Sequence, residues 1–129
     1  MAKFKFLLLF LLLFIGVECK IGAQEAMIFG NAAEYKGSDI IFYTYSDYIT
    51  ETEYEVGRCK VERDGKFNAK LKVLETSFVF AHLGVYRIYF FAEPGKRYEL
   101  VLPPREDKTE AQRLNPFFRE TDLQVGIKN

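Results

Sequence analysis

The feature that most constrains the fold of this chain is its hydrophobic pattern between Ala26 and Pro103. Short apolar or alternating runs follow one another there, and Gly, Pro, Asn and Asp interrupt them at intervals. No part of this region keeps a 3.6-residue apolar period. Alternation with a period of two places every second side chain on one face of an extended strand. The pattern therefore predicts an all-β domain.

Seven runs have the length and composition of strands, because they are rich in the Tyr, Phe, Val and Ile that favour half-buried pleated surfaces. A chain of 129 residues has room for one small domain. We expect a seven-stranded antiparallel β-sandwich over residues 24–104. Its strands are expected at residues 26–31, 40–45, 53–62, 66–73, 77–82, 86–92 and 97–102.

The third and fourth strands are expected to form a hairpin, because Asp64-Gly65 is a strong turn signal. A three-residue loop with Gly65 in the left-handed conformation places apolar residues together on the inner face. Its register pairs Val61 with Phe67, Cys59 with Ala69, and Glu62 with Lys66.

The apolar alternation changes phase at Gly57, with Tyr54 and Val56 facing inward before it. One inserted residue explains this change, so we expect a β-bulge there.

A second hairpin is expected between the last two strands. Pro94-Gly95 fits the central positions of a type II turn, and Glu93 and Lys96 flank it with opposite charges. Residues 86–91 are nearly all aromatic or aliphatic, which indicates a central strand buried on both faces.

The first 23 residues have the pattern of a secretory signal peptide. Lys3 and Lys5 precede an apolar run of 12 residues, 6–17, which is too short for the roughly 20 residues that cross a bilayer. We expect cleavage after Ala23. A lipid anchor on Cys19 is disfavoured, because Glu18 stands where such cleavage needs a small residue. The mature chain then has a slight acidic excess, no transmembrane helix and Cys59 as its single thiol.

Residues 105–129 differ in composition and are expected to form a partly helical linker or tail. Residues 105–113 are polar and favour a helix, and Asn115-Pro116 interrupts them. Leu123, Val125 and Ile127 then alternate like one more strand without an evident partner. This strand indicates either that the chain continues into a downstream region or that the strand adds to a neighbouring molecule.

Few residues have the arrangement that catalysis needs. His82 stands without the His, Cys or carboxylate neighbours of a metal site, and nucleophile-elbow, P-loop and dinucleotide motifs are absent from the sequence. A single thiol in an oxidising compartment is safest when buried, so we expect Cys59 to be buried and unreactive. The acidic row Glu51, Glu53 and Glu55 could help bind Ca²⁺, but it is more typical of a solvated strand edge. We expect no catalytic residue, no cofactor and no metal.

Aromatic residues are the candidates for contacts with a ligand or partner. Exposed tyrosines can stack on sugar rings or anchor a protein partner. A strand between two layers, or a contact with another domain, explains the same residues without a ligand. A Phe-Phe pair is also difficult to hide in a polar tail. The candidates are Tyr43, Tyr45, Tyr48, Tyr54, Phe117 and Phe118.

Several short motifs give the chain a resemblance to the β-sandwich modules found at the front of exported Gram-negative bacterial proteins. They are Phe29-Gly30, residues 40–43, residues 63–67, Glu93-Pro94-Gly95 and Tyr98-Glu99-Leu100. Over residues 26–104 the chain resembles carboxypeptidase-regulatory or transthyretin-like domains, including the domain of unknown function that precedes periplasmic thiol–disulfide oxidoreductases. The resemblance implies an immunoglobulin/transthyretin-like sandwich with an accessory role. It implies no oxidoreductase activity, because the Cys-x-x-Cys motif is absent.

The sequence therefore predicts a non-enzymatic, exported interaction or structural module of the cell envelope, located in the periplasm or outside the cell. Its partner is expected to be a protein or a downstream domain of the same polypeptide. The alternative is a glycan- or peptide-binding module that uses a Tyr-rich sheet face. The 18 basic and 18 acidic side chains exclude a general nucleic-acid binder, which carries a basic excess.

Overall fold

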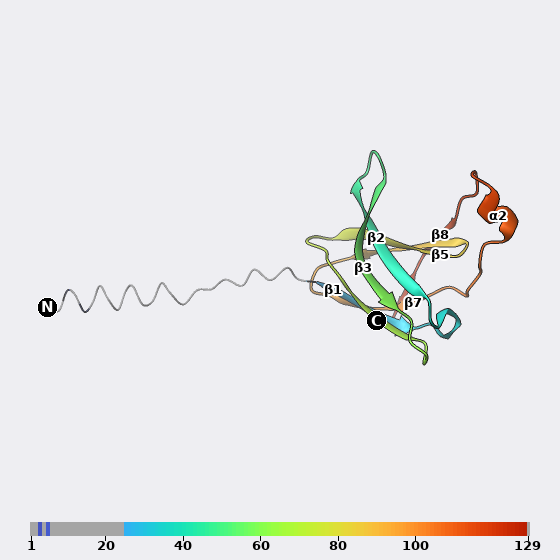
Figure 1. Ribbon diagram of the computed structural model, residues 1–129. Coiled ribbons are helices and arrows are strands. Elements are labelled where there is room, and N and C mark those ends of the chain that lie inside the picture. The colour runs from blue at the N-terminus through green and yellow to red at the C-terminus, as the bar shows by residue number, and fades with distance from the viewer. Residues whose placement is uncertain (1–2, 4, 6–24, 129) are drawn as a thin grey trace.

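A computed structural model of the chain describes residues 25–128, together with Lys3 and Lys5 (Figure 1). The predicted signal peptide otherwise lies outside the described residues, and so does Cys19. No helix in the described part of the chain is long and apolar enough to cross a membrane.

The described residues form a mostly β structure of two packed sheets. Besides the strands there is a short 3-10 helix, Ala33–Tyr35, and one short α-helix, α2, at Glu110–Leu114. The strands are β1 Ala26–Asn31, β2 Asp39–Asp47, β3 Thr52–Lys60, β4 Lys66–Leu71, β5 Ser77–Leu83, β6 Tyr86–Ala92, β7 Arg97–Val101, β8 Thr121–Gln124 and β9 Gly126–Lys128.

The expected β-sandwich is confirmed, and both of its sheets are mixed. One sheet has four strands in the order β4-β1-β7-β9, and the other has five in the order β3-β2-β5-β6-β8. The pairs β1–β7 and β6–β8 are parallel, so the purely antiparallel arrangement predicted from the sequence is wrong. The prediction assumed that consecutive strands pair, whereas these partners are far apart in the chain.

Both predicted turns form, but neither joins two strands of one sheet. Gly65 (φ 84°) and Gly95 (φ 78°) have the expected left-handed conformation. Each turn nevertheless carries the chain from the five-stranded sheet to the four-stranded sheet, from β3 to β4 and from β6 to β7. The two predicted hairpins are therefore wrong as pairings. A tight turn reverses the direction of the chain but does not decide which strand the next one will pair with.

β3 and β4 meet only at the two ends of the register expected from the sequence. The Glu62 N–H donates to the Lys66 carbonyl at 2.9 Å, and the Lys72 N–H donates to the Val56 carbonyl at 2.9 Å. Between these bonds the two strands belong to different sheets, so the expected pairs Val61–Phe67 and Cys59–Ala69 form no ladder.

The bulge expected at Gly57 is confirmed. Phe42 lies opposite Gly57 and Tyr43 lies opposite Glu55, which leaves Val56 as the extra residue. Glycine is required because a Cβ at position 57 would lie 2.6 Å from the carbonyl oxygen of Lys70 on β4. The prediction that Tyr54 faces the core is wrong, because its side chain is 60% exposed.

The core between the sheets is made of alternate residues from both. In β4 the pattern is strictly alternating, and Phe67, Ala69 and Leu71 are buried. Phe42 of one sheet meets Phe90 edge-to-face with ring centroids 6.4 Å apart, and Tyr98 of the other sheet packs against Phe90 at 5.9 Å. The Phe90–Tyr98 contact joins the two layers, and the Phe42–Phe90 contact lies within the five-stranded sheet.

The tail completes both sheets. After Pro103-Pro104 it passes through α2, which projects at one side of the sandwich, and returns as β8, which pairs with β6 (Figure 1). Val125 is buried where the chain crosses to the other sheet, and β9 then pairs with β7. The alternating run therefore forms two short strands whose partners belong to the same chain, and the sheets extend beyond the boundary expected at residue 104.

Candidate binding surface

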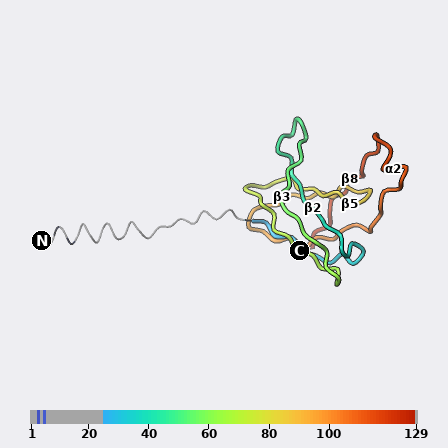
Figure 2. The backbone as a smooth tube through the Cα atoms, viewed as in Figure 1, coloured from blue at the N-terminus to red at the C-terminus, as the bar shows by residue number. Residues whose placement is uncertain are grey.

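The outer face of the five-stranded sheet is the most distinctive surface of the molecule. The register brings Tyr43 opposite Phe80, Phe80 opposite Tyr89, and Phe78 opposite Phe91. Tyr48 joins them from the loop between β2 and β3, which projects from the body of the sandwich (Figure 2). We call this surface the aromatic face, defined by Tyr43, Tyr45, Tyr48, Phe78, Phe80, Tyr89 and Phe91.

The rings of the aromatic face contact one another continuously. Tyr45 stacks on Phe78 with centroids 6.1 Å apart and planes 10° apart. Phe78 in turn lies 5.4 Å from Tyr89 and 5.6 Å from Phe91. Tyr48 meets Tyr45 at 6.0 Å. Such contacts hold the rings in one arrangement.

Phe80 forms the floor of this surface. It is 0% exposed, although it points away from the core between the sheets. Tyr45 lies 4.7 Å from it, and the Arg87 guanidinium lies 5.6 Å from its ring centroid. Arg87 also donates to the Tyr45 hydroxyl at 2.7 Å and pairs with Asp122 of β8 through two nitrogens. The tail therefore helps hold the rings in place.

His82 lies at the polar border of the aromatic face and has a partner on each ring nitrogen. Nδ1 lies 2.7 Å from a Glu120 carboxylate oxygen, and Nε2 lies 2.9 Å from Glu53. Lys108 donates to the other oxygen of Glu120 at 2.9 Å. Burial would raise the pKa of Glu120, but the hydrogen bonds from His82 and Lys108 outweigh it and hold that pKa below its ordinary value. His82 thus ties the tail to the sheet.

A pocket of about 420 Å³ opens beside this network. Sheet residues His82 and Arg87 line it together with tail residues that include Lys108 and Phe118. Because His82 and Arg87 also touch Phe80, the pocket is continuous with the aromatic face.

The candidate residues chosen from the sequence are divided between several places. Tyr43, Tyr45 and Tyr48 lie together on the aromatic face. Phe118 lines the pocket, where Lys108 lies 5.6 Å from its ring. Tyr54 and Phe117 are separate from this surface, and Phe117 is 87% exposed in the tail.

Sequence reasoning missed Tyr89, Phe91 and Arg87 as members of one surface with Tyr45. Residues 86–91 were expected to be buried on both faces, but only Ile88 and Phe90 are buried within that span. The strand is central, between β5 and β8, as expected. The period-two placement of Arg87, Tyr89 and Phe91 was the available signal, but side chains of this size can equally well lie under another layer.

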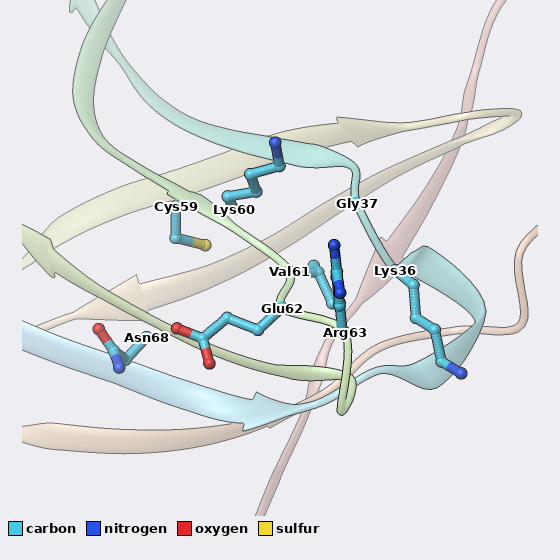
Figure 3. Close-up of a pocket in the computed structure, with 8 residues that line it drawn as sticks. All are labelled: Lys36, Gly37, Cys59, Lys60, Val61, Glu62, Arg63 and Asn68. Carbon is cyan, nitrogen blue, oxygen red and sulfur yellow. The ribbon is translucent and has the colours of Figure 1, made fainter.

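Cys59 faces a second pocket, of about 780 Å³, in the opening between β3 and β4 (Figure 3). Its side chain is only partly buried, which differs from the full burial expected. Burial raises the pKa of the Cys59 thiol to about 11, and the nearby Asp39 carboxylate adds to the shift. The thiol is therefore protonated at neutral pH, and a protonated thiol is a poor nucleophile. Lys36 and Lys60, also at this pocket, point away from it (Figure 3).

The acidic row does not converge on one point. Glu51 lies in the loop with φ 52°, Glu53 binds His82, and Glu55 pairs with Arg58 through both carboxylate oxygens. Among the described residues no group of three His, Cys, Asp or Glu side chains is placed to hold a metal ion.

Comparisons of the chain with protein-family models, with curated proteins and with solved structures found no significant match. The structure itself defines the class of the protein as a β-sandwich of two mixed sheets with four and five strands.

Proposed function

We propose that this chain is an exported β-sandwich module that binds a component of the bacterial cell envelope through its aromatic face and catalyses no reaction. The signal-peptide pattern of residues 1–23 supports export to the periplasm or beyond. The motifs between residues 26 and 104 support the finer placement among immunoglobulin/transthyretin-like accessory domains.

The observation that carries the proposal is the uncovered aromatic face. No described helix or further sheet packs over it. Phe91 is 57% exposed and Tyr48 is 70% exposed, although both lie against other rings. Contiguous exposed apolar surface is costly in water, and where it persists it usually marks a binding site. The rigid tyrosines have the character of interface anchors.

Two further features favour binding over catalysis. The protonated Cys59 lies in the opening between β3 and β4, on a different part of the sandwich from His82. Both nitrogens of His82 are already bound to carboxylates, so the ring is engaged in structure.

The proposal is tested by binding of the mature chain to isolated Gram-negative cell envelopes. A photo-crosslinking amino acid at position 91 should give a saturable product. The same group at position 54 is the matched control, because Tyr54 is equally exposed but lies off the aromatic face. Equal labelling from both positions, or none from position 91, would contradict the proposal.

Export is tested separately by sequencing the N-terminus of the chain recovered from a periplasmic fraction. We expect it to begin at Gln24. Recovery of the intact N-terminus in the cytoplasm would remove the exported part of the proposal.

A further inference from the structure

Charged side chains around the aromatic face contact one another. Arg87 pairs with Asp122, Lys108 pairs with Glu120, and His82 lies between two carboxylates. The adjoining pocket has equal numbers of cations and carboxylates: Arg87, Lys108 and Arg119 against Glu51, Glu120 and Asp122. A charged ligand of either sign would meet like charges as well as opposite ones in this pocket, so its net electrostatic gain would be small. The charge distribution therefore favours an uncharged ligand.

Fixed polar groups and rings lie side by side on this surface. The Tyr45 hydroxyl and the Arg87–Asp122 pair are held by hydrogen bonds directly next to Phe80. They offer donors and acceptors at the border of an aromatic surface. A pyranose ring has the matching chemistry, because its C–H faces are apolar and its rim carries hydroxyls that both donate and accept.

An extended peptide fits this surface less well. Peptides that bind sheets gain much of their affinity from main-chain hydrogen bonds to a free strand edge. The strands that carry most of the aromatic face, β2, β5 and β6, each have a neighbour on both sides. Where these strands are paired, their main-chain groups are used within the sheet, so a ligand over the paired residues must be held by side chains.

We propose that the aromatic face binds an uncharged glycan chain. The exposed rings of Tyr48 and Phe91 and the half-buried ring of Tyr45 stack on its sugar faces. The pocket of about 420 Å³ beside His82 and Arg87 receives the hydroxyls of a neighbouring sugar. This assignment rests on the proposed function, since it names the ligand class of the same surface.

The test is calorimetric titration of the mature chain with β-1,4-linked hexasaccharides of glucose, xylose, mannose and galactose. At least one of these should bind, and 1 M NaCl should leave its affinity unchanged. Phe91→Ala should weaken binding roughly tenfold through the lost ring contact. Tyr54→Ala is the matched control and should bind like the parent chain. Circular dichroism of each variant verifies that the fold is retained.

Three binding results, besides the failure of every hexasaccharide to bind, would overturn the glycan assignment. One is tighter binding of polygalacturonate, with an affinity that falls as salt rises. Another is binding of a proline-rich peptide in place of the hexasaccharides. The third is binding that Tyr54→Ala reduces as much as Phe91→Ala does. If no hexasaccharide binds while position 91 still crosslinks to envelopes, the glycan assignment fails and the proposed function stands; loss of both removes both.

Discussion

At the scale of single residues, Phe80 explains how an aromatic sheet surface can exist without a covering layer. Its ring is fully buried on the outer side of the sheet, beneath Tyr45 and beside the Arg87 guanidinium. The neighbouring rings therefore rest on a well-packed support. Aromatic contacts of this kind contribute about 0.5–1.5 kcal/mol each beyond simple area burial.

Phe80→Ala is expected to lower the free energy of unfolding by about 3 kcal/mol, because it removes a fully buried aromatic side chain. Phe91→Ala removes the same group from an exposed site and should cost under about 1 kcal/mol. Urea unfolding of the two variants measures the difference. Equal losses would show that Phe80 does not support the surface.

Cys59 gives a second prediction at this scale. Its pKa is raised to about 11, so the folded state disfavours the thiolate. The contribution of the protonated thiol to the free energy of unfolding is therefore fully present below the ordinary thiol pKa. It is lost as the pH rises through the pKa of Cys59 in the folded state. We expect slow reaction with a disulfide reagent at pH 8 and fast reaction in 6 M urea. Equally fast reaction of folded and unfolded chains would contradict the raised pKa.

At the scale of elements, the close approach of β3 and β4 depends on Gly57. The bulge at Val56 and the missing Cβ at position 57 let the Lys70 carbonyl come close to β3. The Lys72–Val56 hydrogen bond then closes one end of the opening that contains Cys59.

Gly57→Ala should lower the free energy of unfolding by roughly 2 kcal/mol. The new Cβ would collide with the Lys70 carbonyl oxygen, which is a backbone atom, so the backbone would have to move. Gly126→Ala is the control, since a Cβ there would meet Val101 at 3.4 Å, close to ordinary contact. In thermal unfolding, Gly57→Ala should have a lower melting temperature than Gly126→Ala. The interpretation fails if Gly57→Ala melts like the parent chain.

The link between β5 and the tail should depend on pH. The pKa of Glu120 is lowered in the folded state, so its carboxylate stabilises the fold at pH values above its pKa in the unfolded chain. This stabilisation is lost as the pH falls through the pKa of Glu120 in the folded state. Below about pH 4, the range of an ordinary glutamate, amide exchange in β8 should accelerate more than exchange in β5. In Glu120→Gln this extra acceleration should be absent, and its persistence would show that another group controls the tail.

At the scale of the whole molecule, the C-terminal strands tie the two sheets together. β8 extends the five-stranded sheet, β9 extends the four-stranded sheet, and the buried Val125 joins them. The same segment supplies Asp122 to Arg87 and Glu120 to His82. The tail is therefore part of the sandwich and of the proposed binding surface.

Removal of residues 105–129 should destabilise the sandwich by several kcal/mol, because β6 and β7 become edges and core residues lose cover. Val125→Ala is the milder variant and should cost about 1–2 kcal/mol. Urea unfolding compares both with a chain of residues 24–129. A truncated chain as stable as the full one would show that the tail does not stabilise the sandwich.

The sequence predicted what depends on neighbouring residues. The seven core strands, the bulge at Gly57 and the left-handed Gly65 and Gly95 all follow from local alternation and turn chemistry. The candidate surface was predicted only in part. Tyr43, Tyr45 and Tyr48 were identified, but their partners Phe78, Tyr89 and Phe91 come from other strands. Whether an aromatic side chain faces a second layer or solvent depends on how the sheets pack.

The sequence by itself determined that this chain forms strands, where its turns lie and which side chains share a strand face. Those properties rest on backbone sterics and period-two alternation, which act within a few residues. Tertiary structure decided the strand partners, the parallel pairs and the fate of the tail. Strand pairing joins residues far apart in the chain, and the same turn can lead into the same sheet or across to the other. The arrangement that buries the most apolar surface makes that choice.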